Sequence, residues 1–387
     1  STWSKNFYND RKMYIIDSDG SNLKCITNDL DQTPGAPFWS ENSSGVYFNV
    51  REFGQSNVYY ANLSGQISKV SQGNHMLTMN DLVGNNAVAT WTNPSNPSDI
   101  VSFSVKKFNK IDRLTDVNND IFYNVEFGKV EEINYKSVDG KIVQGWVVKP
   151  PQFDSKKKYP LVLRIHGGPH SMYNVGFNYN FQLHAAQDQV VLYTNPRGST
   201  GYGYDFANAI QNAYPGNDYD DIMAGVDEII SRGYINENKM YVYGGSGGGV
   251  LTSWIVGKTD RFAAASVNYP VTNWFSFVGT TDGAGWYYNF EKFPWEDPTE
   301  HIKRSPLMYV GNVKTPTMLM CGEEDLRTPI SQTEEYYQAL KMNKVPTVMI
   351  RFNEEYHGTS TKPSNFLRTH GYINAWFNKH STKNKVE

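Results

Sequence analysis

One stretch limits the possible folds more than any other. Tyr241–Gly249 reads Tyr-Val-Tyr-Gly-Gly-Ser-Gly-Gly-Gly and runs directly into the apolar segment Val250–Val256. A β-type run, a glycine turn with one serine at its apex and a helical pattern describe a strand, a sharp turn and a helix. Gly244, Ser246 and Gly248 match the G-x-S-x-G nucleophile elbow, in which a strained turn lifts a serine hydroxyl above a sheet. Glycines suit this turn because side chains would collide where the strand and the helix cross.

A phosphate-binding loop is the main alternative for a glycine-rich turn before a helix. A G-x-G-x-x-G fingerprint that starts at Gly245 would need glycine where Val250 stands. A P-loop that ends in Gly257-Lys258-Thr259 would need glycine at Thr252. Neither pattern fits, so the sequence favours a nucleophilic serine and predicts no cofactor.

Length and charge set wider limits. The 387 residues exceed the usual size of one domain, so two domains are expected. The formal net charge is -3, with both signs interspersed, which gives no electrostatic footprint for nucleic acid or an anionic membrane surface. No apolar run approaches the ~20 residues that cross a bilayer. Neutral or peptide-like partners are therefore expected.

Only two cysteines are present, Cys25 and Cys321, so the sequence predicts neither a disulfide framework nor a cysteine metal site. The chain begins with Ser1 rather than methionine. A removed leader or an absent N-terminal region is compatible with this, and the compartment stays open between the cytoplasm and a secreted or periplasmic location.

Residues 1 to about 120 form a repeat region. Met13–Thr27, Val58–Ser71 and Ile100–Thr115 each give a β-rich run, a polar turn and a second run, and their starts lie 45 and 42 residues apart. A period of ~40–45 residues with about four short strands is typical of propeller blades. Fewer than three such units fit here, whereas a propeller closes with about four to eight blades. The region therefore predicts the last blades of an incomplete β-propeller, with a small meandering sheet as the alternative.

The pattern changes after Asp116. Lys129–Pro150 reads as a hairpin with Asp139-Gly140 at its turn, and a proline-punctuated connector follows. Apolar strand runs then alternate with helical patterns. The runs are Leu161–Ile165, Gln189–Tyr193, Lys239–Tyr243, Ala263–Val267, Thr317–Cys321 and Thr347–Phe352, and the helical patterns include Asp218–Arg232, Ser331–Met342 and Phe366–Lys379. This alternation predicts a mostly parallel sheet covered by helices on both faces, with the elbow near its middle.

A serine hydroxyl is a weak nucleophile at neutral pH, so Ser246 needs a base and a carboxylate that orients the base. In this architecture the order along the chain is serine, acid, histidine. His357 is favoured among eight histidines because it follows the strand run Thr347–Phe352 and a short polar loop. Open α/β sheets build their sites at such strand ends. The less favoured histidines lie in the repeat region (His75), near the terminal helix (His370 and His380) or away from strand ends (His184 and His301).

The predicted acid lies in Gly322–Pro329, directly after the strand run Thr317–Cys321. Glu323, Glu324 and Asp325 share this loop, and spacing favours Asp325. A helix cap or an exposed ion pair with the nearby arginine is the alternative role for Asp325.

A tetrahedral acyl-transfer intermediate also needs amide donors for its oxyanion. Gly247 follows the nucleophile, and the loop His166-Gly167-Gly168-Pro169-His170 follows an early strand as required for the second donor. The two histidines are spaced like helical metal ligands, but Gly-Gly-Pro between them prevents a helix, so zinc binding is not favoured.

Five motifs in this order resemble the prolyl oligopeptidase family, in particular its acylaminoacyl-peptidase and dipeptidyl-peptidase-like branch. They are His166-Gly-Gly-Pro169, Asn195-Pro-Arg-Gly-Ser-Thr-Gly-Tyr-Gly203, Gly244-Gly-Ser-Gly-Gly248, Gly322-Glu-x-Asp-x-Arg-x-Pro329 and Glu355-x-His-Gly358. The resemblance covers about residues 125–380. It implies an α/β-hydrolase catalytic domain over residues 125–387, preceded by a partial β-propeller over residues 1–124.

The resemblance also implies a serine peptidase that cleaves short peptides through an acyl-enzyme. By this resemblance Ser246, Asp325 and His357 form the triad, and Gly168 and Gly247 supply the oxyanion amides. Substrate-binding roles are expected for Pro270, Trp274, Phe277 and Arg327, with ordinary aromatic packing as the alternative for the aromatic pair. Arg197 is expected to brace its loop rather than to touch substrate.

Several functions stay open at this point. Exopeptidase, acylaminoacyl-peptidase and oligopeptidase activities are not distinguished, and a carboxylesterase of the same fold would use the same triad. A non-catalytic propeller interaction protein would have a broken triad, whereas all three positions here hold competent residues. An incomplete cap would leave the cleft open or expose edge strands through which a second copy of the chain can pair.

Overall fold

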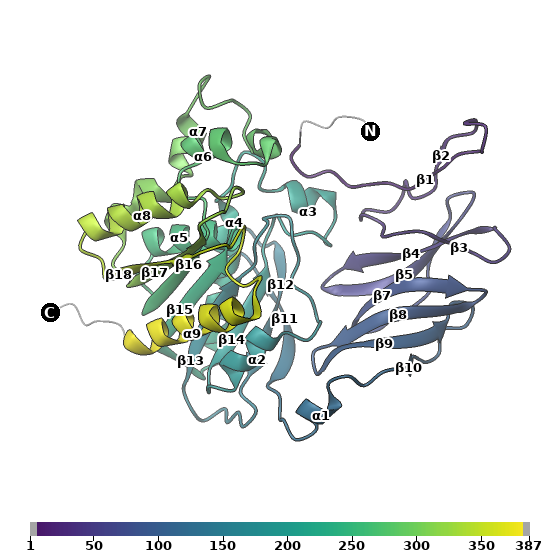
Figure 1. The fold of residues 1–387 in the computed structure, drawn as a ribbon, viewed down its shortest axis with the longest axis horizontal. Coiled ribbons are helices and arrows are strands. Elements are labelled where there is room, and N and C mark those ends of the chain that lie inside the picture. The colour runs from purple at the N-terminus through teal and green to yellow at the C-terminus, as the bar shows by residue number, and fades with distance from the viewer. Residues whose placement is uncertain (1–5, 382–387) are drawn as a thin grey trace.

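The structure is a computed structural model, which describes residues 6–381. Figure 1 shows two parts side by side, a group of small β-units and a large sheet wrapped by helices. Within the described residues, no helix has both the length and the apolar character that a bilayer crossing requires.

The first part consists of short antiparallel strands. Their bounds are β1 (Tyr14–Ile15), β2 (Lys24–Cys25), β3 (Phe38–Trp39), β4 (Gly45–Glu52), β5 (Gln55–Asn62), β6 (Ile67–Lys69), β7 (Met76–Val83), β8 (Asn86–Asn93), β9 (Asn96–Ser104) and β10 (Asp112–Arg113). Strands β3–β6 form one four-stranded unit and β7–β10 a second, while β1 and β2 pair separately. The three predicted repeat segments coincide with the hairpins β1–β2, β5–β6 and β9–β10, which confirms the period.

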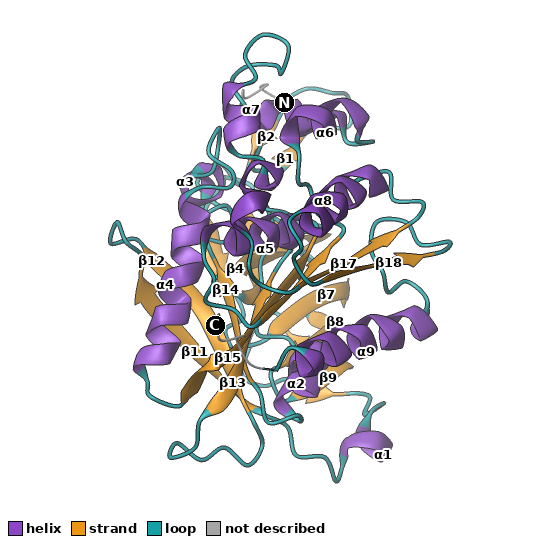
Figure 2. Cartoon of the chain, turned by 90° about the vertical axis from the view of Figure 1, so that its left-hand side faces the viewer, coloured by secondary structure: helices purple, strands orange, loops and turns teal. Residues whose placement is uncertain are grey.

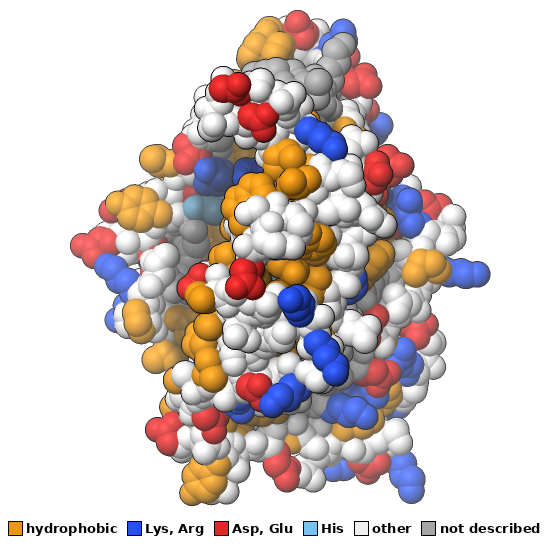
Figure 3. All heavy atoms as spheres, turned by 90° about the vertical axis from the view of Figure 1, so that its right-hand side faces the viewer, with side chains coloured by type: hydrophobic (Ala, Val, Ile, Leu, Met, Phe, Trp, Pro, Cys, Tyr) orange, Lys and Arg blue, Asp and Glu red, His pale blue; other side chains and the backbone are white. Residues whose placement is uncertain are grey.

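Side-chain packing, rather than backbone pairing, joins these units. A single parallel bridge between Ser56 and Met76 links the two four-stranded units. One apolar layer between these two includes Leu77 and Phe103, and another beside β4 includes Ile26 and Phe48. Viewed from this end of the molecule, hydrophobic side chains also reach the surface near the middle of the face (Figure 3). The face-to-face stacking is that of propeller blades.

The second part is built on an eight-stranded sheet with the strand order β11-β12-β14-β13-β15-β16-β17-β18. The bounds are β11 (Lys129–Lys136), β12 (Ile142–Lys149), β13 (Tyr159–Ile165), β14 (Val190–Asn195), β15 (Ile235–Gly245), β16 (Ala264–Asn268), β17 (Thr317–Gly322) and β18 (Thr347–Phe352). The pairs β11–β12 and β12–β14 are antiparallel and the rest are parallel. The predicted hairpin and all six strand runs are thus confirmed.

One boundary differs clearly from the sequence prediction. Strand β15 begins at Ile235, four residues before the predicted start at Lys239. Ile235 pairs with Tyr159 across an irregularity in the ladder. The polar residues that follow Ile235 conceal this start because they interrupt the apolar pattern.

Helices cover both faces of the large sheet (Figure 2). The bounds are α1 (Asn119–Phe122), α2 (Tyr179–Ala185), α3 (Tyr204–Asn208), α4 (Asn217–Ser231), α5 (Gly247–Lys258), α6 (Trp274–Thr280), α7 (Thr299–Lys303), α8 (Ile330–Met342) and α9 (Pro363–Lys379), with short 3-10 helices η1 (Ala284–Asn289) and η2 (Pro306–Asn312). Buried residues of α4, α5 and α8 share one core, whereas α2 and α9 pack against the opposite face. The helices predicted over α4, α8 and α9 are confirmed. The domain boundary predicted at residues 124 and 125 stays a prediction, and only the short helix α1 lies between β10 and β11.

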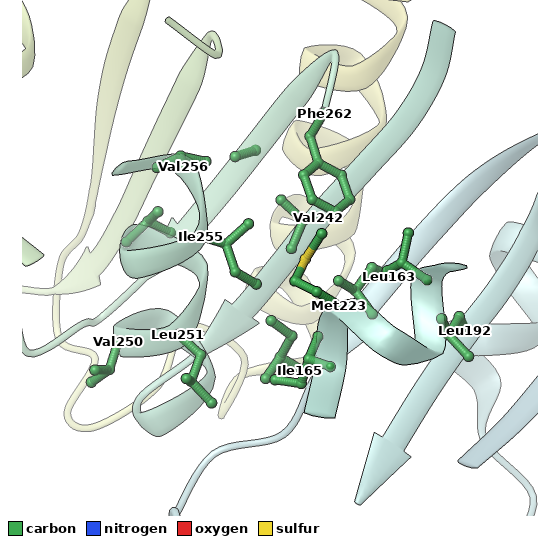
Figure 4. Close-up of a cluster of buried hydrophobic side chains, with 14 of the residues drawn as sticks. Leu163, Ile165, Leu192, Met223, Val242, Val250, Leu251, Ile255, Val256 and Phe262 are labelled. Atoms are coloured by element: carbon green, nitrogen blue, oxygen red, sulfur yellow. The ribbon is translucent and has the colours of Figure 1, made fainter. Parts of the chain in front are cut away.

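The core is deepest around β15 and α5. Leu163, Val242 and Ile255 have no exposed surface, and Met223 and Phe262 pack with them (Figure 4). Burying each such side chain contributes about 1.5–3 kcal/mol. The turn between β15 and α5 therefore stands on the most firmly packed strand and helix of the molecule.

Candidate active site

Ser246 occupies the turn between β15 and α5, as the sequence predicts. Its backbone angles are φ 57° and ψ -123°, a region that residues with a side chain rarely adopt. Such strain costs about 1–3 kcal/mol and persists only where the surroundings enforce it. Here the amide of Ser246 donates to the carbonyl of Asn268 at 3.1 Å, and the carbonyl of Ser246 accepts from the amide of Val250 at 2.9 Å.

Two glycines of the motif are required by close backbone contact. A Cβ added to Gly244 would lie 2.5 Å from the carbonyl oxygen of Gly248, and one added to Gly248 would lie 2.4 Å from that of Ile165. Both distances are well inside van der Waals contact. The elbow therefore lets α5 rise directly over the ends of β13 and β15.

The three predicted triad residues meet at the carboxyl ends of the parallel strands. His357 Nε2 lies 2.9 Å from Ser246 Oγ, and His357 Nδ1 lies 2.9 Å from one carboxylate oxygen of Asp325 and 3.1 Å from the other. Asp325 follows β17 and His357 follows β18, and these strands pair in parallel through Gly322 and Phe352. Their shared register brings the two side chains to the same edge of the sheet.

Asp325 is the carboxylate that faces the histidine. Its side chain is fully buried and accepts from the amides of Arg327 and Thr328 at 3.0 and 2.9 Å. Glu323 and Glu324 are exposed, and Glu323 pairs with an arginine instead. An ionised Asp325 keeps the proton of neutral His357 on Nδ1, which leaves the Nε2 lone pair facing the serine hydroxyl.

Sequence reasoning missed two residues around the base. Tyr269, directly after β16, has φ 34°, and its ring meets that of His357 edge-on with centroids 5.2 Å apart. Burial raises the pKa of Tyr269, so it stays neutral. The hydroxyl of Thr328 lies 3.0 Å from both Asp325 and the carbonyl of Tyr269. Thr328 occupies an unspecified position of the Gly322–Pro329 motif, and only its place after a strand run points to Tyr269.

The two predicted oxyanion segments touch beside the serine. A Cβ added to Gly167 would lie 3.3 Å from Ser246 Cβ, and one added to Gly247 would lie 3.0 Å from the amide nitrogen of Gly168. Gly168 has φ 121°, which favours glycine. Gly247 is the first residue of α5, so its amide has no partner within the helix. This arrangement supports the predicted amide roles, which stay predictions.

The histidines of the loop after β13 brace that loop. His166 bonds the Gly167 carbonyl at 2.7 Å and Ser199 Oγ at 3.0 Å, while His170 bonds the Gly198 carbonyl at 2.9 Å. Burial lowers the pKa of His166 to about 4, so it is neutral near pH 7. Among residues 6–381, no group of three or more His, Cys, Asp or Glu side chains is arranged to hold a metal ion.

Arg197 braces the neighbouring loop, as expected. Its guanidinium is 6% exposed and bonds Asp221, which is completely buried, at 2.6 and 2.8 Å. It also bonds Asp139 in the β11–β12 turn at 2.9 and 3.1 Å. These hydrogen bonds lower the pKa of Asp139 to about 2. The arginine therefore ties the hairpin turn, α4 and the loop after β14 together.

The predicted substrate-binding residues lie in two different settings. Trp274 and Phe277 have no exposed surface and pack in the core, and Pro270 is also buried. Arg327, two residues beyond Asp325 in the chain, is exposed and pairs with Asp282 at 2.5 Å. Burial favours the packing alternative for the aromatic pair, and substrate contact stays a prediction for all four.

Buried His184 is expected to make the stability of the protein depend on pH. His184 of α2 is 1% exposed, bonds Gln189 at 2.8 Å and Tyr243 at 3.0 Å, and burial lowers its pKa to about 4. Because the pKa is lower in the folded than in the unfolded chain, the unfolded chain binds the proton first as the pH falls. The free energy of unfolding should therefore fall by about 2 kcal/mol between pH 7 and pH 5 through this group.

The variant His184→Gln should flatten that slope, because glutamine keeps hydrogen-bonding capacity without titrating. Urea unfolding of both proteins at the two pH values measures the effect. An equally steep slope in the variant would show that other groups carry the acid sensitivity.

Comparison with known proteins extends these findings. The model of the "Prolyl oligopeptidase family" matches residues 175–384. The uncharacterized peptidase YuxL of Bacillus subtilis is 36% identical over 391 residues, which cover 95% of this chain and 59% of that protein. Dipeptidyl-peptidase 5 of Porphyromonas gingivalis is 29% identical over 384 residues, which cover 95% of this chain and 56% of that protein. The acylaminoacyl peptidase structure from Pyrococcus horikoshii (orthorhombic crystal form) gives a TM-score of 0.87 at 27% identity, covering 97% of this chain and 60% of that one.

These matches extend over both the blades and the large sheet of this chain. The chain spans about three fifths of the relatives' length or slightly less. The match to the Pyrococcus horikoshii structure includes nearly the whole chain and confirms the expected α/β-hydrolase sheet preceded by propeller-like blades. The family model alone covers more than half of the residues. The chain therefore belongs to the prolyl oligopeptidase family.

Proposed function

We propose that this chain is a serine peptidase that hydrolyses short peptides. The observation that carries the proposal is the hydrogen-bonded series Ser246 Oγ, His357, Asp325, with distances of 2.9 Å on both sides of the imidazole. The series stands at the ends of parallel strands on a strained elbow, which is where an acyl-transfer nucleophile has to be exposed. Among the relatives, the names acylamino-acid-releasing enzyme and dipeptidyl-peptidase support a peptide substrate.

In the acylation step, Ser246 Oγ attacks the carbonyl carbon of the scissile peptide bond while its proton passes to His357 Nε2. The carboxylate of Asp325 stabilises the imidazolium that forms. The carbonyl oxygen gains a negative charge, and in this proposal the amides of Gly168 and Gly247 donate hydrogen bonds to it. Collapse of the tetrahedral intermediate breaks the carbon–nitrogen bond, and His357 gives its proton to the leaving amine.

In the deacylation step, water takes the place of the amine. His357 accepts a proton from the water as the water oxygen attacks the acyl carbon of the ester on Ser246. Collapse releases the carboxylic acid product, and the proton returns from His357 to Ser246 Oγ. The enzyme is thus restored without any other reactant.

We take a cavity between the blades and the large sheet's loops as the expected entry for a short, extended substrate. It has a volume of about 410 Å³ and lies where the blades meet the loop after β14. Its lining includes Asn49, Arg51 and Thr78 from the blades, together with Thr200 and Gly201 from the loop. Thr200 donates to the carbonyl of Ser171, one residue beyond His170 of the oxyanion loop, at 2.9 Å. A peptide held there is expected to enter the site from the side of the blades.

The proposal is tested by labelling and by substrate choice. A fluorophosphonate should react with Ser246 and leave Ser246→Ala unlabelled, because only an activated serine attacks the phosphorus rapidly. The absence of a Ser246 adduct would overturn the enzyme assignment. Peptide anilides and short acyl nitrophenyl esters should then be compared, and turnover of the esters alone would replace the peptidase by a carboxylesterase.

A further inference from the structure

A buried tyrosine reaches the elbow from the loop before α4. Tyr214 is 1% exposed, and its hydroxyl donates to the carbonyl oxygen of Gly247 at 3.0 Å. Gly247 is also the residue whose amide is predicted to bind the oxyanion. The point where a Cβ of Gly247 would stand is 3.0 Å from the Tyr214 hydroxyl and 3.0 Å from the Gly168 amide nitrogen. The tyrosine hydroxyl therefore contacts the elbow where the two oxyanion segments meet.

The loop that carries Tyr214 is itself firmly held. The ring of Tyr214 packs against Trp274 with centroids 5.8 Å apart. The carbonyl of the next residue, Pro215, accepts a hydrogen bond from Arg304 at 2.6 Å. The amide of Gly216 donates to the buried carboxyl of Asp218 at 2.5 Å. Contacts on both sides of Tyr214 thus fix the direction from which its hydroxyl meets the elbow.

Gly247 is held by contacts with its neighbours rather than by a side chain of its own. Glycine has a wide range of backbone angles, so it has no intrinsic preference for the orientation that aims its amide at the oxyanion. The first residue of a helix also lacks an intrahelical bond for its amide. The Gly247 carbonyl belongs to the peptide unit that follows the Gly247 amide, so the Tyr214 hydrogen bond limits ψ of Gly247 and holds the residue in place. The amide itself shares a peptide plane with the Ser246 carbonyl, which accepts from Val250 at 2.9 Å.

We propose that Tyr214 is a positioning residue for the oxyanion amide of Gly247, a role that rests on the proposed peptidase function. Tyr214 does not touch the reacting atoms. It acts by holding the Gly247 backbone in the orientation that a developing oxyanion requires. Such preorganised donors contribute more in the transition state than in the bound substrate.

The chain offers a matched control, a second tyrosine whose hydroxyl also bonds helix α5. Tyr336 of α8 is fully buried, and its hydroxyl donates to the carbonyl of Ser253 in α5 at 3.1 Å. Both tyrosines therefore give one hydrogen bond to a backbone carbonyl of α5. They differ in place, because Gly247 adjoins the nucleophile and Ser253 lies in the second half of the helix.

The test compares Tyr214→Phe with Tyr336→Phe in the full chain. Tyr214→Phe is expected to lower kcat for a peptide anilide by about tenfold with KM within about twofold, because a less well positioned oxyanion donor weakens binding of the transition state more than binding of the substrate. A peptide aldehyde, which forms a tetrahedral adduct with the serine, should bind more weakly by the same factor. Tyr336→Phe should keep kcat and aldehyde affinity within about twofold of wild type.

Several outcomes would overturn the inference. One is an equal kinetic effect of the two substitutions, and another is a change of KM alone for Tyr214→Phe. A third is a Tyr214→Phe protein that is unfolded while Tyr336→Phe folds, because that result would mark a purely structural role for Tyr214. Wild-type labelling by a fluorophosphonate separates the two proposals. If the wild type labels and turns over peptide while both variants behave alike, only the positioning role fails; if the wild type does neither, the proposed function fails.

Discussion

Replacing His357 by alanine is expected to lower kcat/KM for a peptide anilide by about 10⁴- to 10⁶-fold. In the proposed mechanism the imidazole takes the proton from Ser246 Oγ across a 2.9 Å contact and gives it to the leaving amine, and no other described histidine lies in hydrogen-bond contact with that oxygen. Alanine removes both proton transfers. The side chain is 31% exposed, so its loss should leave folding intact.

Steady-state kinetics and thermal unfolding of His357→Ala test this expectation together. His380→Ala is a suitable control because that imidazole lies beyond α9 against Trp376, with ring centroids 4.3 Å apart, and should leave kcat/KM close to wild type. Asp325→Asn should also lose several orders of magnitude, because an amide at this position favours the wrong tautomer of His357. Turnover of His357→Ala at the wild-type rate would show that another group is the base.

The largest effect on stability is expected from Arg197→Leu. The carboxylate of Asp221 has no exposed surface and is bonded by both the guanidinium and the backbone amide of Arg197. Removing the guanidinium leaves a buried, uncompensated charge, which typically costs about 3–5 kcal/mol. The midpoint of urea unfolding should fall accordingly, with peptide turnover lost in parallel once the protein unfolds.

An exposed arginine provides the comparison. Arg351 pairs with Glu323 and Glu334 on the surface, where all three side chains are 37–50% exposed, so Arg351→Leu should cost about 0–1 kcal/mol. A second comparison is the double variant Arg197→Leu with Asp221→Leu. It should recover part of the lost stability, because a buried ion pair can often be replaced by apolar side chains at little net cost. Equal destabilisation by Arg197→Leu and Arg351→Leu would show that the buried pair is not a main stabilising contact.

The elbow and its partners could be predicted because their chemistry leaves a local signature. Gly244 and Gly248 are needed at the crossing of strand and helix. The candidates for the acid lie in one short loop after β17, and the candidate for the base lies in one short loop after β18. Parallel strands bring such loops to the same edge, so chain order and strand-end position together predict that His357 and one carboxylate of the Gly322–Pro329 loop reach Ser246. Asp325 differs from its two acidic neighbours in being buried and bonded to His357, and sequence spacing favours it without excluding them.

Other features depend on contacts between distant segments. Tyr214 lies in a loop without a motif, and its hydroxyl meets an elbow 33 residues away in the chain. Trp274 and Phe277 are aromatic residues after a strand, and the sequence does not distinguish a pocket wall from core packing for such residues. The structure buries both completely. The start of β15 was hidden because polar residues follow Ile235. In each case the outcome is decided by tertiary packing rather than by local pattern.

The order of the site residues along the chain has a consequence for protein synthesis. His357 follows Ser246 by 111 residues, and it reaches the serine only when β18 pairs with β17. At about 5–20 residues per second, a ribosome finishes the base about 5–20 s after the nucleophile. Throughout that interval the nascent chain carries an elbow serine with nothing to activate it. The proposed site is therefore complete only after the last strand of the sheet has been synthesised and has paired with β17.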